Sequence, residues 1–311
     1  MKLSLSVNWC NRRIESGEEI ADTAAALGFD ELEIGFRTTA SQVEGIRRRT
    51  DTIAVGSVHA FAPAPLSAPS AHPELYSLAS FDAESRSMAR LQILRTAEFA
   101  SGIGARTVVL HAGRISLGGF LSKIDSPTLV EKLLKGGGNS IGRSYMRLMS
   151  TARRRREGRG RVMLDLLKKE LSSLVPELER LGVTLALENL PYYEAFPDER
   201  EMRCLLDEFA GAPVSAWFDT GHDYIRRECG WKSMNVAPLK IGDVRGMHLN
   251  DVSGVEDEHL APGFGKVDFA ALKSMAEAAE HVVFEPASSV SADELGKGLS
   301  FIRNLWGNEK T

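Results

Sequence analysis

Short apolar runs alternate with amphipathic stretches along the whole chain. The apolar runs lie at 3–9, 31–36, 53–60, 106–111, 183–189, 214–219, 244–249 and 281–286. Runs of this length, rich in β-branched residues, predict strands that are buried on both faces of a parallel sheet. Helical periodicity fills the intervals and predicts helices at 17–27, 39–49, 82–101, 162–181, 198–210, 222–241 in broken form, 268–280 and 291–306.

Eight successive strand–helix units in 311 residues predict one α/β domain, a (β/α)8 TIM barrel spanning 1–311. A doubly wound parallel sheet is the alternative. Such a sheet usually carries a Gly-rich phosphate loop after its first strand, and the sequence SVNWCNRR at that place has none. Ser16 and Asp198 are expected to cap helix starts, and Gly28, Gly102 and Gly182 to end helices.

Two segments depart from a minimal barrel. Residues 61–81 are rich in Pro, Ala and Ser and predict a loop after the third strand. Residues 113–161 form a long insertion after the fourth strand, expected to be a loop or helical segment on the catalytic rim. Loops of this length inside a compact domain are usually functional or partly mobile.

Composition and charge narrow the class of protein. Hydrophobic residues make up 43% and charged residues 26%, which suits a globular domain with a large core. The net charge of -4 gives no general signature of nucleic-acid or membrane binding. No apolar run approaches the roughly 20 residues that span a bilayer. The N-terminus lacks the pattern of a signal peptide, and the three cysteines share no CxxC spacing. We expect a cytoplasmic protein with free thiols, and homo-oligomerisation stays open.

Four chemically active residues each sit at the downstream end of a predicted strand. They are Glu188, Asp219, His248 and Glu285, in the runs VTLALEN, VSAWFDTGH, VRGMHLND and HVVFEP. The carboxyl ends of parallel barrel strands meet at one rim, where barrel enzymes hold their active sites. Three carboxylates and one imidazole suit a divalent ion such as Mn²⁺, Mg²⁺, Co²⁺ or Zn²⁺.

Histidines gather at the same predicted rim. Five of the seven lie at strand ends or just after them: His59, His111, His222, His248 and His259. Asp257 forms a D-x-H pair with His259 in the loop after the seventh strand. We therefore expect these side chains to line a binding site. His72 and His281 are expected to be structural or exposed, and Glu33, Trp9 and Lys266 are weaker site candidates.

These motifs resemble the xylose-isomerase-like TIM-barrel superfamily, which holds sugar and sugar-phosphate isomerases and epimerases and also endonuclease IV. The stretches that carry the resemblance are SVHAFAPAP, LASFDAESR, ASGIGARTVVLHAG, LALENL, WFDTGHDY, GMHLNDVSGVEDEHLAPGFGKVDF and FEP. They cover most of the chain outside the insertion. They are specific for the superfamily and weak for the substrate.

Resemblance to the sugar epimerase branch implies one divalent metal held by Glu188, Asp219, His248 and Glu285. It implies that the two glutamates also move the substrate proton and that His222 contacts substrate. The expected function is therefore a metal-dependent isomerase or epimerase acting on a small sugar, sugar phosphate or related ketone. His59, His111, Asp257 and His259 join His222 as expected substrate-binding residues. An inositol-ketone dehydratase using the same first proton abstraction stays open.

Resemblance to the endonuclease IV branch implies a different function, in which three zinc ions cleave abasic DNA. All nine ligand types of that branch are present in this sequence: His59, His111, Glu188, Asp219, His222, His248, Asp257, His259 and Glu285. The acidic net charge weighs against a DNA partner, because a duplex binder needs a positive footprint. A barrel that binds a small molecule without turnover is a third class, which the intact set of ligands argues against.

The basic run Arg153–Arg156, with Arg143, Arg147, Arg159 and Arg161, leaves three interpretations open. The first is a solvated loop or helix start. The second is a cover over the pocket that holds a substrate phosphate. The third is contact with a DNA backbone.

Overall fold

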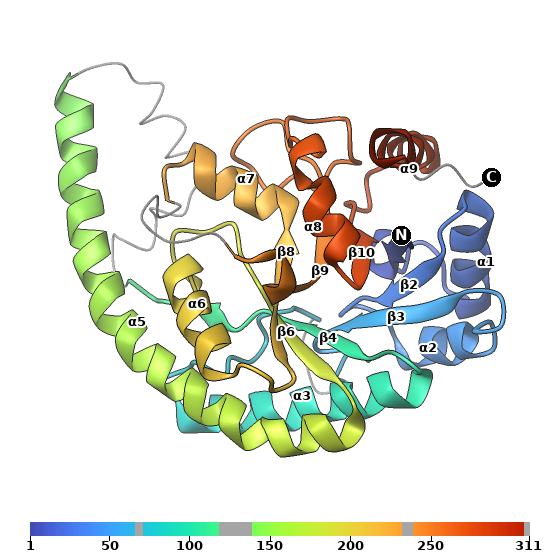
Figure 1. Cartoon of the computed structure of the whole chain (residues 1–311), viewed down its shortest axis with the longest axis horizontal. Helices are drawn as coiled ribbons and strands as arrows, with labels where there is room; N and C mark the ends of the chain where they lie inside the picture. Colours follow the sequence, from blue (N-terminus) through green and yellow to red (C-terminus); the bar gives the residue numbers. More distant parts are fainter. Residues whose placement is uncertain (66–70, 118–138, 232–238, 308–311) are drawn as a thin grey trace.

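The computed structural model describes residues 1–65, 71–117, 139–231 and 239–307. Eight parallel strands close into a barrel in the order β1-β10-β9-β8-β6-β4-β3-β2 (Figure 1). Each strand lies within a predicted run: β1 (Ser4–Ser6), β2 (Glu31–Ile34), β3 (Ala54–His59), β4 (Thr107–Leu110), β6 (Thr184–Glu188), β8 (Val214–Asp219), β9 (Val244–Leu249) and β10 (His281–Phe284). The closed parallel barrel confirms the predicted fold and excludes the doubly wound sheet.

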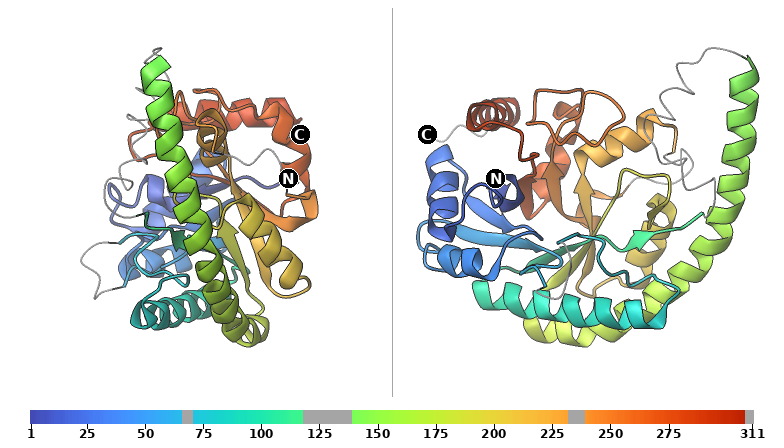
Figure 2. Two further views of the ribbon diagram at one scale, coloured as in Figure 1. Left: turned by 90° about the vertical axis from the view of Figure 1, so that its left-hand side faces the viewer. Right: turned by 180° about the vertical axis from the view of Figure 1, so that it is seen from behind.

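Helices flank the barrel on its outside, as Figure 2 shows from two further sides. They are α1 (Gly17–Leu27), α2 (Ala40–Arg47), α3 (Ala83–Ile103), α5 (Asn139–Leu181), α6 (Glu199–Glu208), α7 (Thr220–Glu228), α8 (Lys273–Ala278) and α9 (Ala292–Trp306). Short 3-10 helices follow β1 and precede β9 and α8: η1 (Val7–Trp9), η3 (Ile241–Asp243) and η4 (Ala270–Leu272). A small antiparallel pair, β5 (Gly113–Arg114) with β7 (Ala195–Phe196), lies outside the barrel.

The helix boundaries follow from their caps. The Ser16 side chain accepts a hydrogen bond from the Glu19 amide at the start of α1, and Asp198 forms a capping box at α6, as predicted. The prediction that Gly102 ends a helix was wrong. Helix α3 continues to Ile103 and ends at Gly104, whose φ of 90° is the left-handed conformation that favours glycine.

Helix α5 is much longer than predicted. It begins at Asn139 rather than at residue 162, so residues 139–161 of the predicted insertion are continuous with the helix that precedes β6. The basic stretch lacks a regular apolar stripe, but arginine, methionine and leucine all have high intrinsic helix propensity. Residues 118–138, which include the GGF sequence, lie outside the described residues.

The described arginines of the basic run make structural contacts. Arg156 is buried and lies 2.8 Å from Asp198 and 2.9 Å from Glu201, which joins α5 to the start of α6. Arg155 donates to the carbonyl of Leu117, whereas Arg153 pairs with Glu157 on the same helix. The run thus lies within α5, with Arg156 as a buried contact to the start of α6.

None of the helices within the described residues is long and apolar enough to cross a membrane. The three cysteines are free thiols, as predicted, with Cys10 and Cys229 buried and Cys204 exposed.

A separate small cluster of buried side chains, Val109, Ala186, Trp217 and Val283, comes from four barrel strands. The Trp217 ring packs edge-on against the His248 ring at 5.0 Å between centroids. Gly246 on β9 leaves the space that Trp217 occupies, because a Cβ atom at that position would lie 2.2 Å from the indole ring. The indole therefore supports the imidazole from inside the barrel.

We expect Gly246→Ala to destabilise the protein by about 1–3 kcal/mol, because the added methyl group forces Trp217 out of its position. Gly102→Ala is the matched control, since a Cβ atom added there meets nothing within 4 Å and alanine favours a helix. Chemical denaturation of both variants checks the difference. A Gly246→Ala protein as stable as the control would contradict this packing.

Candidate metal centre

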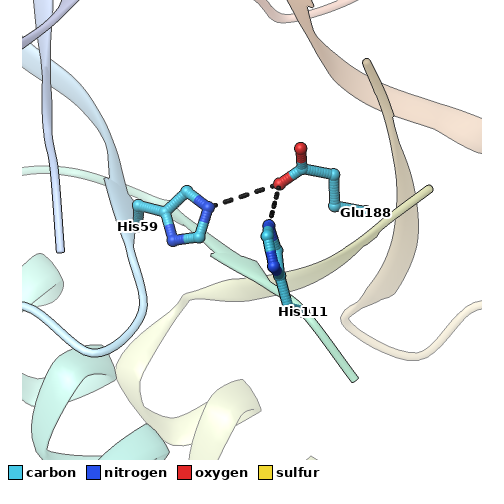
Figure 3. Close-up of side chains that lie close together, drawn as sticks. All are labelled: His59, His111 and Glu188. Atoms are coloured by element: carbon cyan, nitrogen blue, oxygen red, sulfur yellow. Dashed lines mark hydrogen bonds and ion pairs between the residues drawn. The ribbon is translucent and has the colours of Figure 1, made fainter. Parts of the chain in front are cut away.

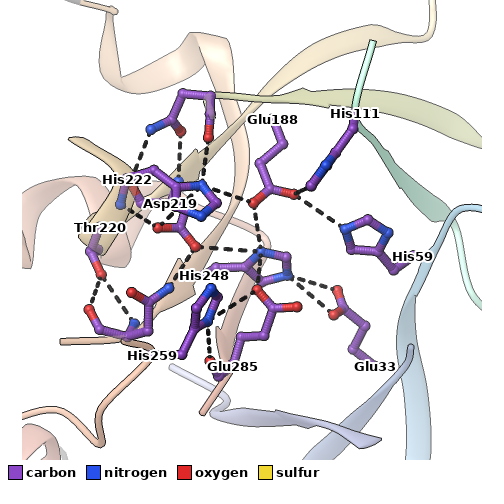
Figure 4. A network of polar contacts seen from close by, with 12 residues as sticks. Glu33, His59, His111, Glu188, Asp219, Thr220, His222, His248, His259 and Glu285 are labelled. Carbon is purple, nitrogen blue, oxygen red and sulfur yellow. Dashed lines mark hydrogen bonds and ion pairs between the residues drawn. The ribbon is translucent and has the colours of Figure 1, made fainter. Parts of the chain in front are cut away.

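The four residues predicted at strand ends meet at one place inside the rim of the barrel. One ligand atom from each of Glu188, Asp219, His248 and Glu285 lies within 4.8 Å of the others, and all four residues are buried. His248 Nδ1 is at the centre of the group, 3.3 Å from Glu188 Oε1 and 3.1 Å from Glu285 Oε2 (Figure 4). We call these residues the four-residue group.

Local backbone structure explains why Asp219 points inward. It ends β8 and is also the N-cap of α7, where its Oδ1 accepts a hydrogen bond from the amide of His222 at 2.8 Å. Asn250 donates its side-chain amide to the other carboxylate oxygen at 2.6 Å. The sequence FDTGH thus places one carboxylate and, one helical turn later, one imidazole at the same rim.

His59 and His111 form a second group with Glu188, as Figure 3 shows. The Nε2 atoms of the two histidines lie 3.3 Å and 3.1 Å from Glu188 Oε2. Because the other oxygen of Glu188 faces His248, this one carboxylate belongs to both groups. We call His59, His111 and Glu188 the β3–β4 group.

His222, Asp257 and His259 form a third group, nearer to solvent. Asp257 Oδ1 lies 3.4 Å from His222 Nε2 and 3.2 Å from His259 Nε2. The Asp257 side chain is 30% exposed and that of His259 is 21% exposed, whereas Glu188 and Asp219 are fully buried. We call this set the outer group, and its exposure indicates the side from which a ligand enters.

All nine residues of the predicted wider site are therefore brought together in three groups, two of which share Glu188. His72 and His281 lie elsewhere, as expected. The His72 ring accepts a hydrogen bond from the amide of Glu74, and His281 is buried beside Thr107.

Each histidine of the site holds one ring nitrogen away from its group. Nδ1 of His59, His222 and His259 lies 2.7–2.8 Å from the backbone carbonyls of Ala60, Asn189 and Glu285. Because a carbonyl only accepts, these Nδ1 atoms carry a hydrogen, so Nε2 is the nitrogen whose lone pair can bind a metal ion once it has lost its proton. His111 turns Nδ1 toward Glu74 at 3.7 Å, and His248 turns Nε2 toward Glu33 at 3.1 Å. Metal-binding histidines are usually oriented in this way.

The spacing of the facing atoms also fits a metal ion. Ligands about 2.0–2.1 Å from a tetrahedral zinc ion lie about 3.3 Å from one another. The closest nitrogen–oxygen distances in the three groups are 3.1 Å, 3.1 Å and 3.2 Å. Donor type, locked tautomers and spacing thus agree that the residues present fit a divalent ion.

Burial makes the groups electrostatically interdependent. Burial alone lowers the pKa of His111, but the Glu188 carboxylate outweighs it and raises the pKa to about 9. Burial likewise lowers the pKa of His222, and the carboxylates of Asp219 and Asp257 outweigh it and raise this pKa to about 9. Burial raises the pKa of Asp219 to about 6. In the metal-free protein the imidazoles of His111 and His222 therefore carry protons that compensate the buried carboxylates.

We expect metal binding to release protons and to tighten as pH rises from about 6 to about 9, because a metal ion and a proton compete for the same nitrogen. The pKa of His248 lies well above its usual range, so its nitrogen also competes with the metal ion as a proton acceptor.

The stability of the metal-free protein should fall as pH rises, opposite to the trend in metal affinity. The stability that a protonated His111 or His222 contributes is complete below about pH 6.5 and is lost as pH passes about 9. Zn²⁺ titrations and thermal melts across this pH range measure both trends, and a pH-independent affinity would contradict the first.

Several residues that order the site were missed by the sequence interpretation. Asn189 and Asn250 bind the backbone or side chain of Asp219. Asp251 accepts hydrogen bonds from the amides of Gly263, Gly265 and Val267 and so folds the loop that follows the outer group. Asn189 and Asn250 directly follow the strands that carry Glu188 and His248. That position at the strand ends is the signal that could have identified them.

His259 has a φ of 49°, a left-handed conformation that is uncommon for a residue other than glycine. Its Nδ1 is held by the carbonyl of Glu285, and its Nε2 faces Asp257. Backbone strain of this kind is concentrated at functional sites.

Solved structures with the same architecture include several sugar epimerases. A D-tagatose 3-epimerase-like protein matches with a TM-score of 0.66 and 19% identity, covering 99% of this chain and 98% of its own. The 3-keto-D-glucoside 4-epimerase YcjR of E. coli matches with a TM-score of 0.65 and 17% identity, over 98% of this chain and 99% of its own. A Thermus thermophilus protein, in a structure from soaking with ZnCl2, matches with a TM-score of 0.61 and 22% identity over 100% of both chains.

Sequence comparison gives one relative and one family. An uncharacterized protein of Methanocaldococcus jannaschii is 27% identical over 144 residues, which are 46% of this chain and 54% of that protein. The chain thus spans about half the length of this curated relative. The model of the xylose isomerase-like TIM barrel family matches residues 138–305, more than half of the chain. With its closed eight-stranded barrel and its ligand groups at the strand ends, this chain belongs to the xylose isomerase-like TIM barrel family.

Proposed function

We propose that this protein is a metal-dependent isomerase or epimerase that acts on a small sugar, sugar phosphate or related ketone. The observation that carries the proposal is that Glu188 and Glu285 reach the same nitrogen, His248 Nδ1, from β6 and from the end of β10. Two carboxylates are therefore held close to one proposed metal ligand, and a substrate bound to that metal would lie near a base for proton transfer at carbon.

A divalent ion at the four-residue group would polarise the carbonyl and hydroxyl oxygens of an α-hydroxy-carbonyl substrate. One of the two glutamates removes the proton from the carbon beside the carbonyl. The electron pair of that C–H bond becomes the double bond of an enediolate, and the negative charge moves to oxygen. The other glutamate, or the same one after the substrate has turned, returns a proton to carbon. His59, His111, His222, Asp257 and His259 contact substrate hydroxyl groups in this reaction.

The four-residue group favours this interpretation because it is the most complete of the three. It has four ligands and is the most deeply buried, whereas the β3–β4 group depends on the shared Glu188. The net charge of -4 also suits a small polar substrate better than a DNA duplex.

A second candidate function is hydrolysis of a phosphodiester by three metal ions, as in abasic DNA repair. The specific observation that favours it is that all three groups have metal-like spacing and oriented histidines. Sites with several metals are typical of phosphoryl chemistry. In the isomerase, the β3–β4 group and the outer group bind substrate instead.

Metal analysis combined with an isotope-exchange assay tests the first function against the second. The protein is loaded with Mn²⁺, Co²⁺ or Zn²⁺, and the bound metal is counted by mass spectrometry. It is then incubated in deuterated water with ketoses such as D-fructose, D-tagatose and D-psicose and with ketose phosphates. We expect about one metal per chain and deuterium on the carbon beside the carbonyl. Three Zn²⁺ per chain and metal-dependent nicking of an abasic duplex would instead establish the second function.

Asp257→Asn sharpens the test because Asp257 belongs to the outer group alone. For an isomerase we expect an unchanged metal count and a KM raised about 10-fold, the loss of roughly 1.4 kcal/mol of binding. For the trinuclear enzyme the variant loses about one metal ion and most of its turnover. Glu170→Gln, a buried carboxylate that pairs with Arg86 and Arg90 outside the barrel, is the control for general effects on the fold.

A further inference from the structure

A buried carboxylate beside the metal centre has no role in the proposed reaction. Glu33 lies on β2 and is fully buried, and both of its oxygens approach His248 Nε2, at 3.1 Å and 3.2 Å (Figure 4). Strand β2 is not a neighbour of β9 in the barrel, since β1 and β10 lie between them. Glu33 therefore crosses the barrel interior to reach a residue of the four-residue group.

The position of Glu33 is itself fixed. Ser57 donates its hydroxyl to Glu33 Oε2 at 2.9 Å, and the two residues are paired in register on the adjacent strands β2 and β3. Ser57, Glu33 and His248 thus form a continuous chain of side chains that ends at the metal centre.

The His248 ring has its plane set by packing. It is stacked on the His59 ring with 5.9 Å between centroids and an angle of 5°, and Trp217 packs edge-on at 5.0 Å. Packing alone does not decide which nitrogen carries the hydrogen. When a metal ion binds at Nδ1, between Glu188 and Glu285, the ring hydrogen must lie on Nε2. The Glu33 carboxylate accepts that hydrogen, because an ionised carboxylate only accepts, and so favours the tautomer that binds the ion through Nδ1.

Burial of a carboxylate is costly unless the charge has a strong partner. Among the described residues, the hydrogen-bond partners of the Glu33 side chain are His248 and Ser57, and neither carries a permanent charge. A proton on His248 supplies positive charge beside Glu33 in the metal-free protein, and a cation bound at Nδ1 would supply it through the imidazole in place of that proton. The arrangement matches the carboxylate–histidine–metal relay that raises ligand basicity in metalloproteins.

We infer that Glu33 is a positioning residue of the metal centre, which fixes His248 as an Nδ1 ligand and sets the affinity of the four-residue group for its divalent ion. The inference rests on the metal centre of the proposed function and deepens it, but it does not depend on which substrate is turned over. It predicts that Glu33 acts on metal affinity before it acts on any reaction.

The test measures metal affinity directly. Metal-free protein is titrated with Zn²⁺ and Co²⁺ in competition with a chromophoric chelator, for the unchanged chain and for Glu33→Gln, Glu33→Asp, Ser57→Ala and Glu170→Gln. We expect Glu33→Gln to bind about 10- to 100-fold more weakly. Glu33→Asp should recover part of the loss because it keeps the charge, and Ser57→Ala should lose a few-fold. Glu170→Gln should bind as the unchanged chain does, because its carboxylate lies away from the metal centre.

A second readout separates positioning from mere structural support. The visible spectrum of bound Co²⁺ and the ¹⁵N shifts of His248 should change in Glu33→Gln, because the tautomer is no longer fixed. The inference is overturned if Glu33→Gln binds Zn²⁺ within about twofold of the unchanged chain and keeps the Co²⁺ spectrum, since the loss of this relay typically costs more. If Glu33→Gln does not fold, Glu33→Asp and Ser57→Ala decide: unchanged affinity in both overturns it.

The outcomes also separate this inference from the proposed function. Weaker metal binding in Glu33→Gln, in a protein that turns over no sugar, would support the role of Glu33 and contradict the isomerase. An active isomerase whose metal affinity is unchanged in Glu33→Gln would support the proposed function and contradict the role of Glu33.

Discussion

Glu188→Gln is expected to lower kcat by about 10³-fold or more while the barrel stays folded. Glu188 belongs to two of the three ligand groups, and its two oxygens face different histidines at 3.1–3.3 Å. A neutral amide removes the base, weakens the metal ligand and leaves the imidazoles beside a group that can donate a hydrogen bond to them. Among the nine residues of the site, Glu188 is the one shared between two groups.

The measurement compares kcat, KM, bound metal and the far-ultraviolet circular dichroism spectrum of Glu188→Gln with those of Glu285→Gln. Glu285 belongs to the four-residue group alone, so its variant should lose turnover while the β3–β4 group stays intact. Full activity of either variant on the substrate that the unchanged protein converts would refute the assignment of that glutamate to proton transfer.

Removal of the metal should abolish turnover and lower the melting temperature by about 5–10 °C, because an ion at about 1,000 times its Kd stabilises the folded state by about 4 kcal/mol. The unfolded chain does not hold the ligands together. The metal-free site keeps buried carboxylates close together at Glu33, Glu188, Asp219 and Glu285, which the ion no longer compensates. Both effects should reverse when a divalent ion is restored.

Chelator dialysis, verified by elemental analysis, followed by thermal melts and activity assays, checks this expectation. Glu188→Gln is the matched control, since its melting temperature should respond much less to added metal. A protein that is free of metal by analysis yet retains its turnover would contradict a metal-dependent mechanism of either kind.

The local sequence was sufficient to predict the barrel. Each strand lies inside an apolar run whose length and β-branched content are readable without a structure, and each pattern of this kind depends only on neighbours in sequence. The predicted start of α5 was wrong because that prediction, too, used only neighbours in sequence. Its arginine-rich half has no apolar stripe, and its buried anchor, Arg156, is recognisable only through Asp198 and Glu201, which lie in a later part of the chain.

The candidate site likewise has features that depend on local sequence and features that depend on contacts between distant segments. The sequence by itself determined which strand ends carry ligands, because parallel strands of a barrel must deliver their carboxyl ends to one rim. It left Glu33 as a weaker candidate without a partner, since nothing near it in sequence relates it to His248.

Only the tertiary structure decided how the nine residues divide into three groups, that Glu188 serves two of them, and that Glu33 crosses the barrel to reach His248. The physical reason is that strand periodicity fixes the direction of each side chain, whereas distances across the barrel depend on strand order, register and closure. Those quantities belong to the assembled sheet and to no single segment of the chain.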